Sequence, residues 1–321
     1  MDSPGPLVFF GTPEFAVPSL ERLAASRYRP SLVVSQPSRP SGRGRKLHAP
    51  PVARRAAKLG LSCVQIGRVR SEGFLERMEA LAPWVGVVVA FGQIFPRRLL
   101  EIPAEGCINV HGSLLPKYRG AAPIQAAIAA GDVVTGVTTQ RMAKAVDSGP
   151  IFLERQIEIG ADETAPELAA RLATAGADLL LETLEGIAEG AIAAQAQDET
   201  EVSVAPRLEK KEGEVDWNLS VASIYNRYRA YQPWPGLSSV FRGEAVKIVE
   251  CHPSSRTTGV VDAIERSPGT VLSSSPELQV VCGDGGVLVL DRLQRPSRRA
   301  LSGLDFANGE HVEIGDRFGS L

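Results

Sequence analysis

The stretch WVGVVVAFGQIFPRRLLEIPAEGCINVH, residues 84–111, holds two apolar runs of strand length, WVGVVVA and CINVH. Two runs of the same kind precede it, LVFF at residues 7–10 and SLVVS at residues 31–35, with helix-like segments between them. Strands that are apolar along their whole length are expected to be buried on both faces, which is typical of parallel sheets covered by helices. The first half therefore predicts an α/β, doubly wound, Rossmann-like domain with a mainly parallel sheet.

The second half of the chain is organised differently. An Ala- and Leu-rich helix is predicted over about residues 165–189, and from residue 194 the sequence turns polar and loses its periodicity, as linkers do. After a further helical piece at 221–232, short apolar runs separated by Gly, Pro and Ser predict a small β-barrel. We expect a first domain at residues 1–193, a linker at 194–208 and the barrel domain at 209–321.

The amino-acid composition indicates which class of protein to expect. The 321 residues, 44% hydrophobic and 22% charged, have the composition of a soluble globular protein. No apolar segment approaches the roughly 20 residues needed to cross a bilayer, and the first seven residues lack the features of a secretory signal. Four cysteines lie far apart without metal-ligand spacing, so we expect reduced thiols and no metal. We expect a cytoplasmic, monomeric protein with no membrane partner.

Charge is distributed unevenly along the chain. Twelve Lys and Arg and no Asp or Glu lie between Arg22 and Ser71, although the net charge is only −2. Such a stretch is a candidate contact for nucleic-acid phosphates, and solvated helix faces and loops explain it equally well. Residues 207–321 hold 14 basic and 15 acidic residues, so nucleic-acid binding there would need a clustered basic face. The candidates for that face are Arg292, Arg295, Arg298 and Arg299.

Candidate catalytic side chains follow two of the predicted strands. Asn109 and His111 are two residues apart at the end of a strand, so both leave the same face of the sheet. Asp147 follows the strand-like segment 136–142 and could reach the same crevice, at the carboxyl ends of the strands where open α/β sheets bind ligands. The trio has too few ligands for metal hydrolysis, and no G-x-S-x-G motif supplies a nucleophile nearby.

Asn, His and Asp together suit direct acyl transfer to an amine. An attacked amide-like carbonyl becomes an oxyanion, which an Asn N–H and an imidazolium stabilise by about 3 kcal/mol each. A carboxylate beside the imidazole favours its charged form and offers a route for the proton that the amine loses. On spacing alone, an Asn and His that only cap a loop, and an ordinary Asp-Ser-Gly turn, remain the alternative. Of four histidines in the chain, His111 has the most polar neighbours in sequence.

The run CINVHGSLLPKYRGAAPIQ at residues 107–125, followed by AGD, TGVT and Asp147-Ser-Gly-Pro, resembles the formyltransferases that use 10-formyltetrahydrofolate. The resemblance implies that Asn109, His111 and Asp147 are catalytic, that 10-formyltetrahydrofolate is the formyl donor, and that no metal is needed. It also implies contacts with the folate. The positions expected to make them are Ser113, Leu114, Leu115 and Pro116, together with Ala90 and Gly92 near the apolar pterin pocket.

Three further segments resemble the branch of this family whose acceptor is methionyl initiator tRNA. They are FFGTPEFAVPSL at residues 9–20, SQPSRPSGRGRKL at 35–47 and YQPWPG at 231–236. This branch implies transfer of the formyl group to the amino group of methionine on the initiator tRNA. The resemblance places the basic loop, with Arg43, Arg45 and Lys46, at the acceptor end of the tRNA, and implies a C-terminal domain like an oligonucleotide-binding (OB) fold that holds the tRNA body.

The sequence departs from the family pattern at a few positions. Ala143 and Ala145 stand in the loop before Asp147, where an acidic residue and a glycine are common, and Phe91 stands where Tyr is frequent. Two alternatives stay open at this point. Glycinamide ribonucleotide or an amino-sugar acceptor would require a small-molecule pocket and no basic loop, and an RNA-binding protein without activity would have no need of the Asn/His/Asp set.

Overall fold

The computed structural model describes residues 4–41, 46–255 and 267–319, and the chain divides into two compact units. Unit 1 comprises Met1–Pro123, Val134–Glu158 and Glu167–Pro206, and unit 2 comprises Ile124–Val133, Ile159–Pro166 and Arg207–Leu321. Two short segments from the first half of the chain therefore belong to the unit that is otherwise C-terminal.

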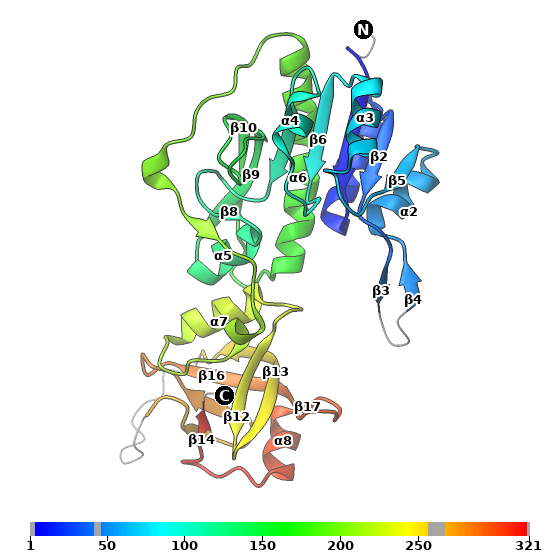
Figure 1. Cartoon of the computed structure of the whole chain (residues 1–321). Coiled ribbons are helices and arrows are strands. Elements are labelled where there is room, and N and C mark those ends of the chain that lie inside the picture. The colour runs from blue at the N-terminus through cyan, green and yellow to red at the C-terminus, as the bar shows by residue number, and fades with distance from the viewer. Residues whose placement is uncertain (1–3, 42–45, 256–266, 320–321) are drawn as a thin grey trace. The chain divides into compact units, whose positions relative to one another are not determined.

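Unit 1 is built on a seven-stranded sheet with the strand order β10-β9-β7-β6-β1-β2-β5 (Figure 1). The strands are β1 (Leu7–Gly11), β2 (Leu32–Ser35), β5 (Cys63–Gln65), β6 (Val85–Val89), β7 (Cys107–His111), β9 (Val134–Arg141) and β10 (Ile151–Glu158). The first five of these run parallel, and β9 and β10 continue the sheet in antiparallel fashion. The doubly wound, mainly parallel sheet predicted from the apolar runs is confirmed.

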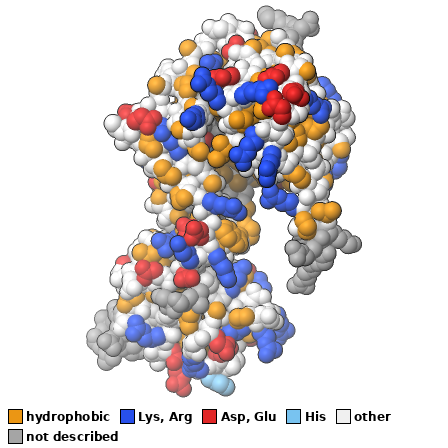
Figure 2. Space-filling view, in the orientation of Figure 1, with side chains coloured by type: hydrophobic (Ala, Val, Ile, Leu, Met, Phe, Trp, Pro, Cys, Tyr) orange, Lys and Arg blue, Asp and Glu red, His pale blue; other side chains and the backbone are white. Residues whose placement is uncertain are grey.

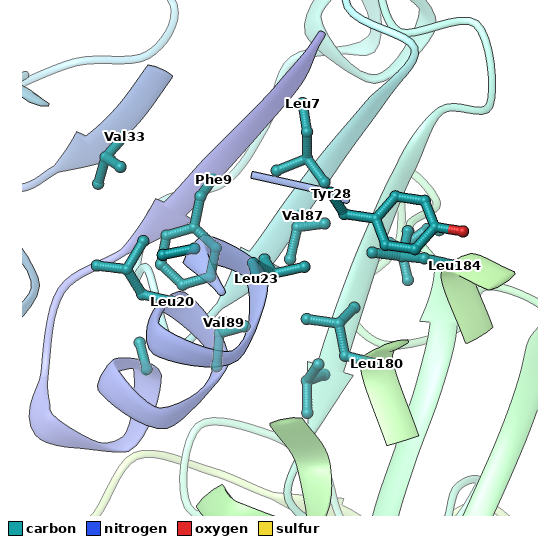
Figure 3. Packing of buried hydrophobic residues seen from close by; sticks show 14 of the residues in the cluster. Leu7, Phe9, Leu20, Leu23, Tyr28, Val33, Val87, Val89, Leu180 and Leu184 are labelled. Carbon is teal, nitrogen blue, oxygen red and sulfur yellow. The ribbon is translucent and has the colours of Figure 1, made fainter. Parts of the chain in front are cut away.

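Helices cover both faces of this sheet. They are η1 (Glu14–Ala16), α1 (Val17–Ala24), α2 (Pro51–Lys58), α3 (Glu72–Leu81), α4 (Arg97–Glu101) and α6 (Ala165–Ala188); a further short helix, η2 (Glu199–Glu201), lies in the segment after α6. One apolar core joins the sheet to α1, α2 and α6, and a second joins it to α3 and α4. In Figure 3, Phe9 of β1 lies close to Leu20 and Leu23 of α1, while Leu180 of α6 approaches the same core. Each such side chain contributes roughly 1.5–3 kcal/mol when fully buried, which fixes the helices against the sheet.

The strand order places a topological switch point between β1 and β6. The chain runs from β1 outward through β2 to β5, and then returns to the other side of β1 as β6 and β7. The loops that follow β1 and β6 therefore lead away in opposite directions and leave a crevice at the carboxyl ends of the strands. Two small ladders accompany the main sheet: β3 (Arg39–Ser41) with β4 (Lys46–His48), and β8 (Arg119–Gly120) with β11 (Val204–Ala205).

Unit 2 is centred on an antiparallel sheet with the order β14-β15-β16-β13-β12-β18. Its strands are β12 (Leu237–Phe241), β13 (Glu244–Pro253), β14 (Val271–Ser273), β15 (Gln279–Val281), β16 (Val287–Gln294), β17 (Leu301–Ser302) and β18 (Phe318–Gly319), and its helices are α5 (Pro123–Ala130), η3 (Lys210–Gly213), α7 (Val221–Ala230) and α8 (Gly303–Gly309). A bridge between Thr270 and Arg317 joins the two edges of the sheet. The predicted small β-barrel is confirmed.

Surface charge and the state of the cysteines are further features of the fold. Figure 2 shows basic and acidic side chains interspersed on the visible face of unit 2, without a large area of one sign. All four cysteines are free thiols, as expected, and burial raises the pKa of Cys107 to about 12. In the described ranges we find no helix with the length and apolar character of a membrane span, and no group of three or more His, Cys, Asp or Glu able to hold a metal ion.

Candidate active site

Strand β7 carries Asn109 and His111 on the face of the sheet that α3 and α4 cover. Cys107, two residues earlier, packs into the core on that face, so the period of two along the strand assigns the other two to it. Asn109 is half-buried and His111 is only 5% exposed. The neighbouring strand β9 places Gln140 opposite Asn109 and Thr138 opposite His111. Polar residues from two strands therefore share one patch at the carboxyl end of β7.

His111 lies between a backbone carbonyl and a carboxylate. Its Nε2 is 2.9 Å from the carbonyl oxygen of Tyr118, and its Nδ1 is 3.6 Å from Oδ2 of Asp147. A carbonyl oxygen only accepts hydrogen bonds, so Nε2 carries a hydrogen. The distance to Asp147 is that of an ion pair and is too long for a hydrogen bond, which leaves Nδ1 able to bond to a third group. The structure thus brings the predicted His111 and Asp147 together.

Asp147 is held in a fixed position by its neighbours. Its Oδ2 accepts a hydrogen bond of 2.9 Å from the N–H of Gly120, and its Oδ1 accepts one of 3.0 Å from the side-chain amide of Gln140. Its backbone is left-handed, with φ of +50°, a conformation that costs a non-glycine residue on the order of 1 kcal/mol. A side chain at Gly149 would collide with the carbonyl oxygen of Arg141. The loop after β9 is therefore closely fitted around the carboxylate.

The segment that resembles the folate-contacting motif follows β7 directly. Ser113 is buried, and its hydroxyl donates a hydrogen bond of 2.6 Å to the carbonyl oxygen of Lys117. The hydroxyl of Thr138 is 2.7 Å from the carbonyl oxygen of Ser113 and accepts a hydrogen bond of 3.1 Å from the N–H of Leu115. Leu114 and Pro116 are half-buried. This loop is well ordered by its own contacts, and its binding to a folate stays a prediction.

The loop after β6 lies at the switch point of the sheet. Ala90 and Gly92 both adopt positive φ, +46° and +79°, and both are exposed, whereas Phe91 between them is buried against Phe10. The carbonyl oxygen of Phe91 accepts a hydrogen bond of 2.7 Å from the side-chain amide of Gln36, which follows β2. The backbone groups of two exposed residues are thus presented to the crevice beside an apolar side chain.

The basic loop is only partly described by the structure. Arg43 and Arg45 lie outside the described residues, and for Lys46 the structure gives only its place at the start of β4. The hairpin that carries the loop pairs Arg39 with His48 and Pro40 with Leu47. The hairpin of β3 and β4 lies between β2 and α2 in the chain.

Three supporting residues were not predicted from the sequence. Gln140 and Gln197 hold the loop of Asp147, and Tyr118 provides the carbonyl oxygen that bonds to His111. Thr138 and Gln140 are opposite His111 and Asn109 on β7, but their neighbours Thr139 and Arg141 are also polar, so β9 shows no polar/apolar alternation that would have assigned them to the site. Gln197 lies in a polar, aperiodic segment, where the sequence offers no such signal either.

The four arginines proposed for the barrel do not form one free basic face. Arg292 pairs with Glu250 at 2.9 Å, and Arg295 pairs with Glu310 at 2.8 Å. Among the residues that the structure covers, Arg298 and Arg299 have no carboxylate partner, and both line a cavity of about 1000 Å³ beside α8.

Comparisons with known proteins identify the family. The sequence matches the family described as formyl transferase over residues 7–184, and the formyl transferase C-terminal domain over residues 207–311. A solved N-formyltransferase from Helicobacter canadensis, in complex with folinic acid and dTDP-3-aminofucose, has a similar fold, with a TM-score of 0.68 and 18% sequence identity over 88% of this chain and 98% of that one.

Full-length relatives decide the branch. A methionyl-tRNA formyltransferase of Solibacter usitatus is 42% identical over 313 residues, which is 98% of both chains. One from Thermus thermophilus is 42% identical over 315 residues, covering 98% of this chain and 99% of the relative. With both family domains present and this identity maintained along nearly the whole length, the chain belongs to the methionyl-tRNA formyltransferase family.

Proposed function

We propose that this protein transfers the formyl group of 10-formyltetrahydrofolate to the amino group of methionyl initiator tRNA, giving formylmethionyl-tRNA for translation initiation. The observation that carries the proposal is the patch at the end of β7, where His111 and Asp147 are 3.6 Å apart and Asn109 lies on the same face. The division into a catalytic domain (residues 1–193), a linker (194–208) and a tRNA-binding domain (209–321) is part of the proposal, as are a cytoplasmic location and a monomeric state.

In the proposed reaction the nucleophile is the neutral amine of the methionyl group. It attacks the formyl carbon, whose carbonyl oxygen becomes an oxyanion. The side-chain N–H of Asn109 and the Nδ1–H of protonated His111 stabilise that oxyanion, each by about 3 kcal/mol. Asp147 lies beside Nδ1 and fixes the ring, while the carbonyl oxygen of Tyr118 holds the opposite nitrogen. No residue of the protein forms a covalent intermediate.

Collapse of the oxyanion completes the transfer. The new C–N bond to methionine remains, the bond between the formyl carbon and N10 of the folate breaks, and its electron pair returns to N10. The attacking nitrogen loses one proton and N10 gains one, so the reaction is balanced. The carboxylate of Asp147 is the group closest to His111 that can receive the proton from the amine.

The two loops at the switch point are the proposed donor site. The exposed backbone of Ala90 and Gly92 offers hydrogen bonds to a pterin edge, with buried Phe91 and Leu115 supplying apolar contact. On the acceptor side we propose that Arg43, Arg45 and Lys46 contact the acceptor end of the tRNA. Unpaired nucleotides are suited to this, because a basic loop can reach both their phosphates and their exposed bases.

The test is transfer of labelled formyl from 10-formyltetrahydrofolate to four acceptors in parallel: methionyl initiator tRNA, methionyl elongator tRNA, glycinamide ribonucleotide and an amino-sugar nucleotide. We expect selective labelling of the initiator tRNA. Labelling of a small acceptor instead would retain the donor site and reject the proposed acceptor. No transfer to any of the four would reject the reaction.

A further inference from the structure

Residues 195–205, which follow α6, run across the active site of unit 1, and we call them the strap. At one end, Gln195 and Ile151 exchange two backbone hydrogen bonds of 2.7 and 2.8 Å. At the other end, β11 pairs with β8, and the carbonyl oxygen of Ala205 accepts a bond of 2.8 Å from the N–H of Ala121. The strap is thus attached to the start of β10, which follows the loop of Asp147, and to β8, which follows His111 in the chain.

Gln197 of the strap binds the loop of Asp147 directly. Its side-chain amide donates hydrogen bonds to the carbonyl oxygens of Asp147, at 2.8 Å, and Gly149, at 2.7 Å. These carbonyls belong to the left-handed residue itself and to the residue two positions after it. Holding both of them fixes the backbone at the one position from which the Asp147 carboxylate reaches the N–H of Gly120 and the amide of Gln140.

A second side chain orients Gln197 itself. The guanidinium of Arg119 donates two hydrogen bonds, of 2.9 and 2.7 Å, to the side-chain oxygen of Gln197, so the amide nitrogen must face the two carbonyls. Arg119 also pairs with Glu199 of the strap at 2.8 Å, and its side chain is only 11% exposed. The orientation of the Gln197 amide is therefore determined by partners on each side of it.

Ser203 binds the other neighbour of His111. Its hydroxyl accepts a hydrogen bond of 2.9 Å from the N–H of Tyr118, and its carbonyl oxygen accepts one of 2.9 Å from the N–H of Arg119. Tyr118 adopts φ of +60°, and its carbonyl oxygen is the partner of His111 Nε2. Close contact extends to Gly120, where a side chain would lie 2.5 Å from the carbonyl oxygen of Ala205.

We propose that the strap positions the catalytic pair, with Gln197 holding Asp147 and Ser203 holding the Tyr118 carbonyl that orients His111. The two are positioning residues, because neither is placed to touch the reacting atoms. This inference rests on the proposed function, since it assigns His111 and Asp147 to catalysis. It also assigns a catalytic purpose to a segment whose composition is that of a linker.

The first test is Gln197→Glu, which keeps the size of the side chain and its acceptor for Arg119 but replaces the donor with an oxygen that repels both carbonyls. We expect kcat to fall by roughly 10- to 100-fold, the effect of losing two buried hydrogen bonds, with KM for the folate and for the tRNA nearly unchanged. The control on the same segment is Glu201→Gln, whose side chain is exposed and which we expect to behave like wild type. Ser203→Ala should lower kcat less, with recovery in Ser203→Thr.

Two further measurements separate positioning from a general structural effect. In an Asp147→Asn background, Gln197→Glu should cause little additional loss, because it acts through Asp147. Amide hydrogen exchange over residues 143–150, which needs no substrate, should be faster in Gln197→Glu than in wild type and unchanged in Glu201→Gln. Losses that multiply in the double variant, or unchanged exchange with unchanged kcat, would overturn the inference. If wild type transfers no formyl group, the proposed function fails, and the exchange arm still decides whether Gln197 holds the loop.

Discussion

The patch at the end of β7 and the arginines of the barrel differ in how the distance between side chains in the sequence relates to their distance in the structure. In the first, side chains far apart in the sequence meet: Asp147 lies beside His111, and Gln197 reaches the same loop from the strap. In the second, arginines close together in the sequence separate, because Arg292 and Arg295 each pair with a different carboxylate. The end of a strand determines the direction of its side chains, whereas arginines that are close together in the sequence need not form one basic surface.

Removal of the central side chain of the first region should have the largest effect. We expect His111→Ala to lower kcat by at least about 100-fold, since it removes both an oxyanion donor and the partner of Asp147. Binding of tRNA should change little, because the proposed tRNA contacts, Arg43, Arg45 and Lys46, lie in another loop of the sequence. Steady-state formyl transfer, with tRNA affinity measured separately, checks this expectation; turnover near the wild-type rate in a folded variant would remove His111 from the mechanism.

The paired arginines of the barrel should matter for stability. Arg295 is 13% exposed, pairs with Glu310 and lies over the ring of Phe306. The carboxylate of Glu310 is partly exposed, so the loss should be smaller than for a fully buried pair: Arg295→Ala should lower the free energy of unfolding of the barrel by roughly 1–3 kcal/mol, as for the loss of hydrogen bonds to a charged group. Urea unfolding followed by the fluorescence of the barrel tryptophans measures it.

The same pair predicts a dependence on pH. Hydrogen bonds from Arg295 lower the pKa of Glu310. A carboxyl whose pKa is lowered on folding contributes stability above its unfolded pKa, about 4.3, and loses it as the pH falls through the lower folded value. The difference in stability between wild type and Arg295→Ala should therefore be full at pH 7 and shrink below about pH 4. A constant difference over that range would show that packing, and not the ion pair, accounts for the effect.

Three arginines line the cavity beside α8, and the two that have no carboxylate partner among the described residues, Arg298 and Arg299, should matter for binding and not for stability. Removing Arg298 and Arg299 together should weaken tRNA binding by several fold. It should also reduce the slope of log Kd against log salt by about one for each phosphate that the protein no longer neutralises. Arg292→Ala is the matched control, because its guanidinium is already paired with Glu250, and we expect little change. Equal effects of the two changes would mean that pairing does not decide which arginines bind.

The smallest expected effect is a difference in the reactivity of the cysteine thiols. Burial raises the pKa of Cys107 in β7 and of Cys282 in the barrel to about 12, whereas Cys63 at the edge of the sheet is half-buried. Native protein at pH 8 should therefore be alkylated by iodoacetamide at Cys63 first, as measured by peptide mass spectrometry. Adding urea in steps then compares the two regions, because the thiol that reacts next belongs to the region that opens more easily.

The sequence predicted those parts of the fold that follow from burial. Strands β1 and β6 are buried at every position and read as uninterrupted apolar runs. Strand β10 was not predicted, since its burial alternates at the edge of the sheet and half of its sequence, IFLERQIE, is polar. The long helix α6 was predicted from its Ala and Leu content, and its observed bounds, Ala165–Ala188, agree closely.

The candidate site was predictable only where backbone periodicity fixes direction. Asn109 and His111 share a strand, so their common face followed from a period of two. The approach of Asp147 depended on how a loop folds back, and the contribution of Gln197 on hydrogen bonds between segments 50 residues apart, which leave no periodic signal. The strap is held by hydrogen bonds and not by apolar packing. Its sequence therefore lacks an apolar period, and this is why the segment was predicted to be a linker.

The most direct test of the central claim is a double-mutant cycle between His111 and Asp147, read as the single-turnover rate of formyl transfer to methionyl initiator tRNA at saturating substrates. If Asp147 acts mainly through His111, the losses should not multiply: Asp147→Ala should slow His111→Ala by a much smaller factor than it slows the wild type, and the remaining loss reflects the role of Asp147 as proton acceptor. Losses that multiply in the double variant would contradict the account, because the two residues would then contribute to catalysis independently.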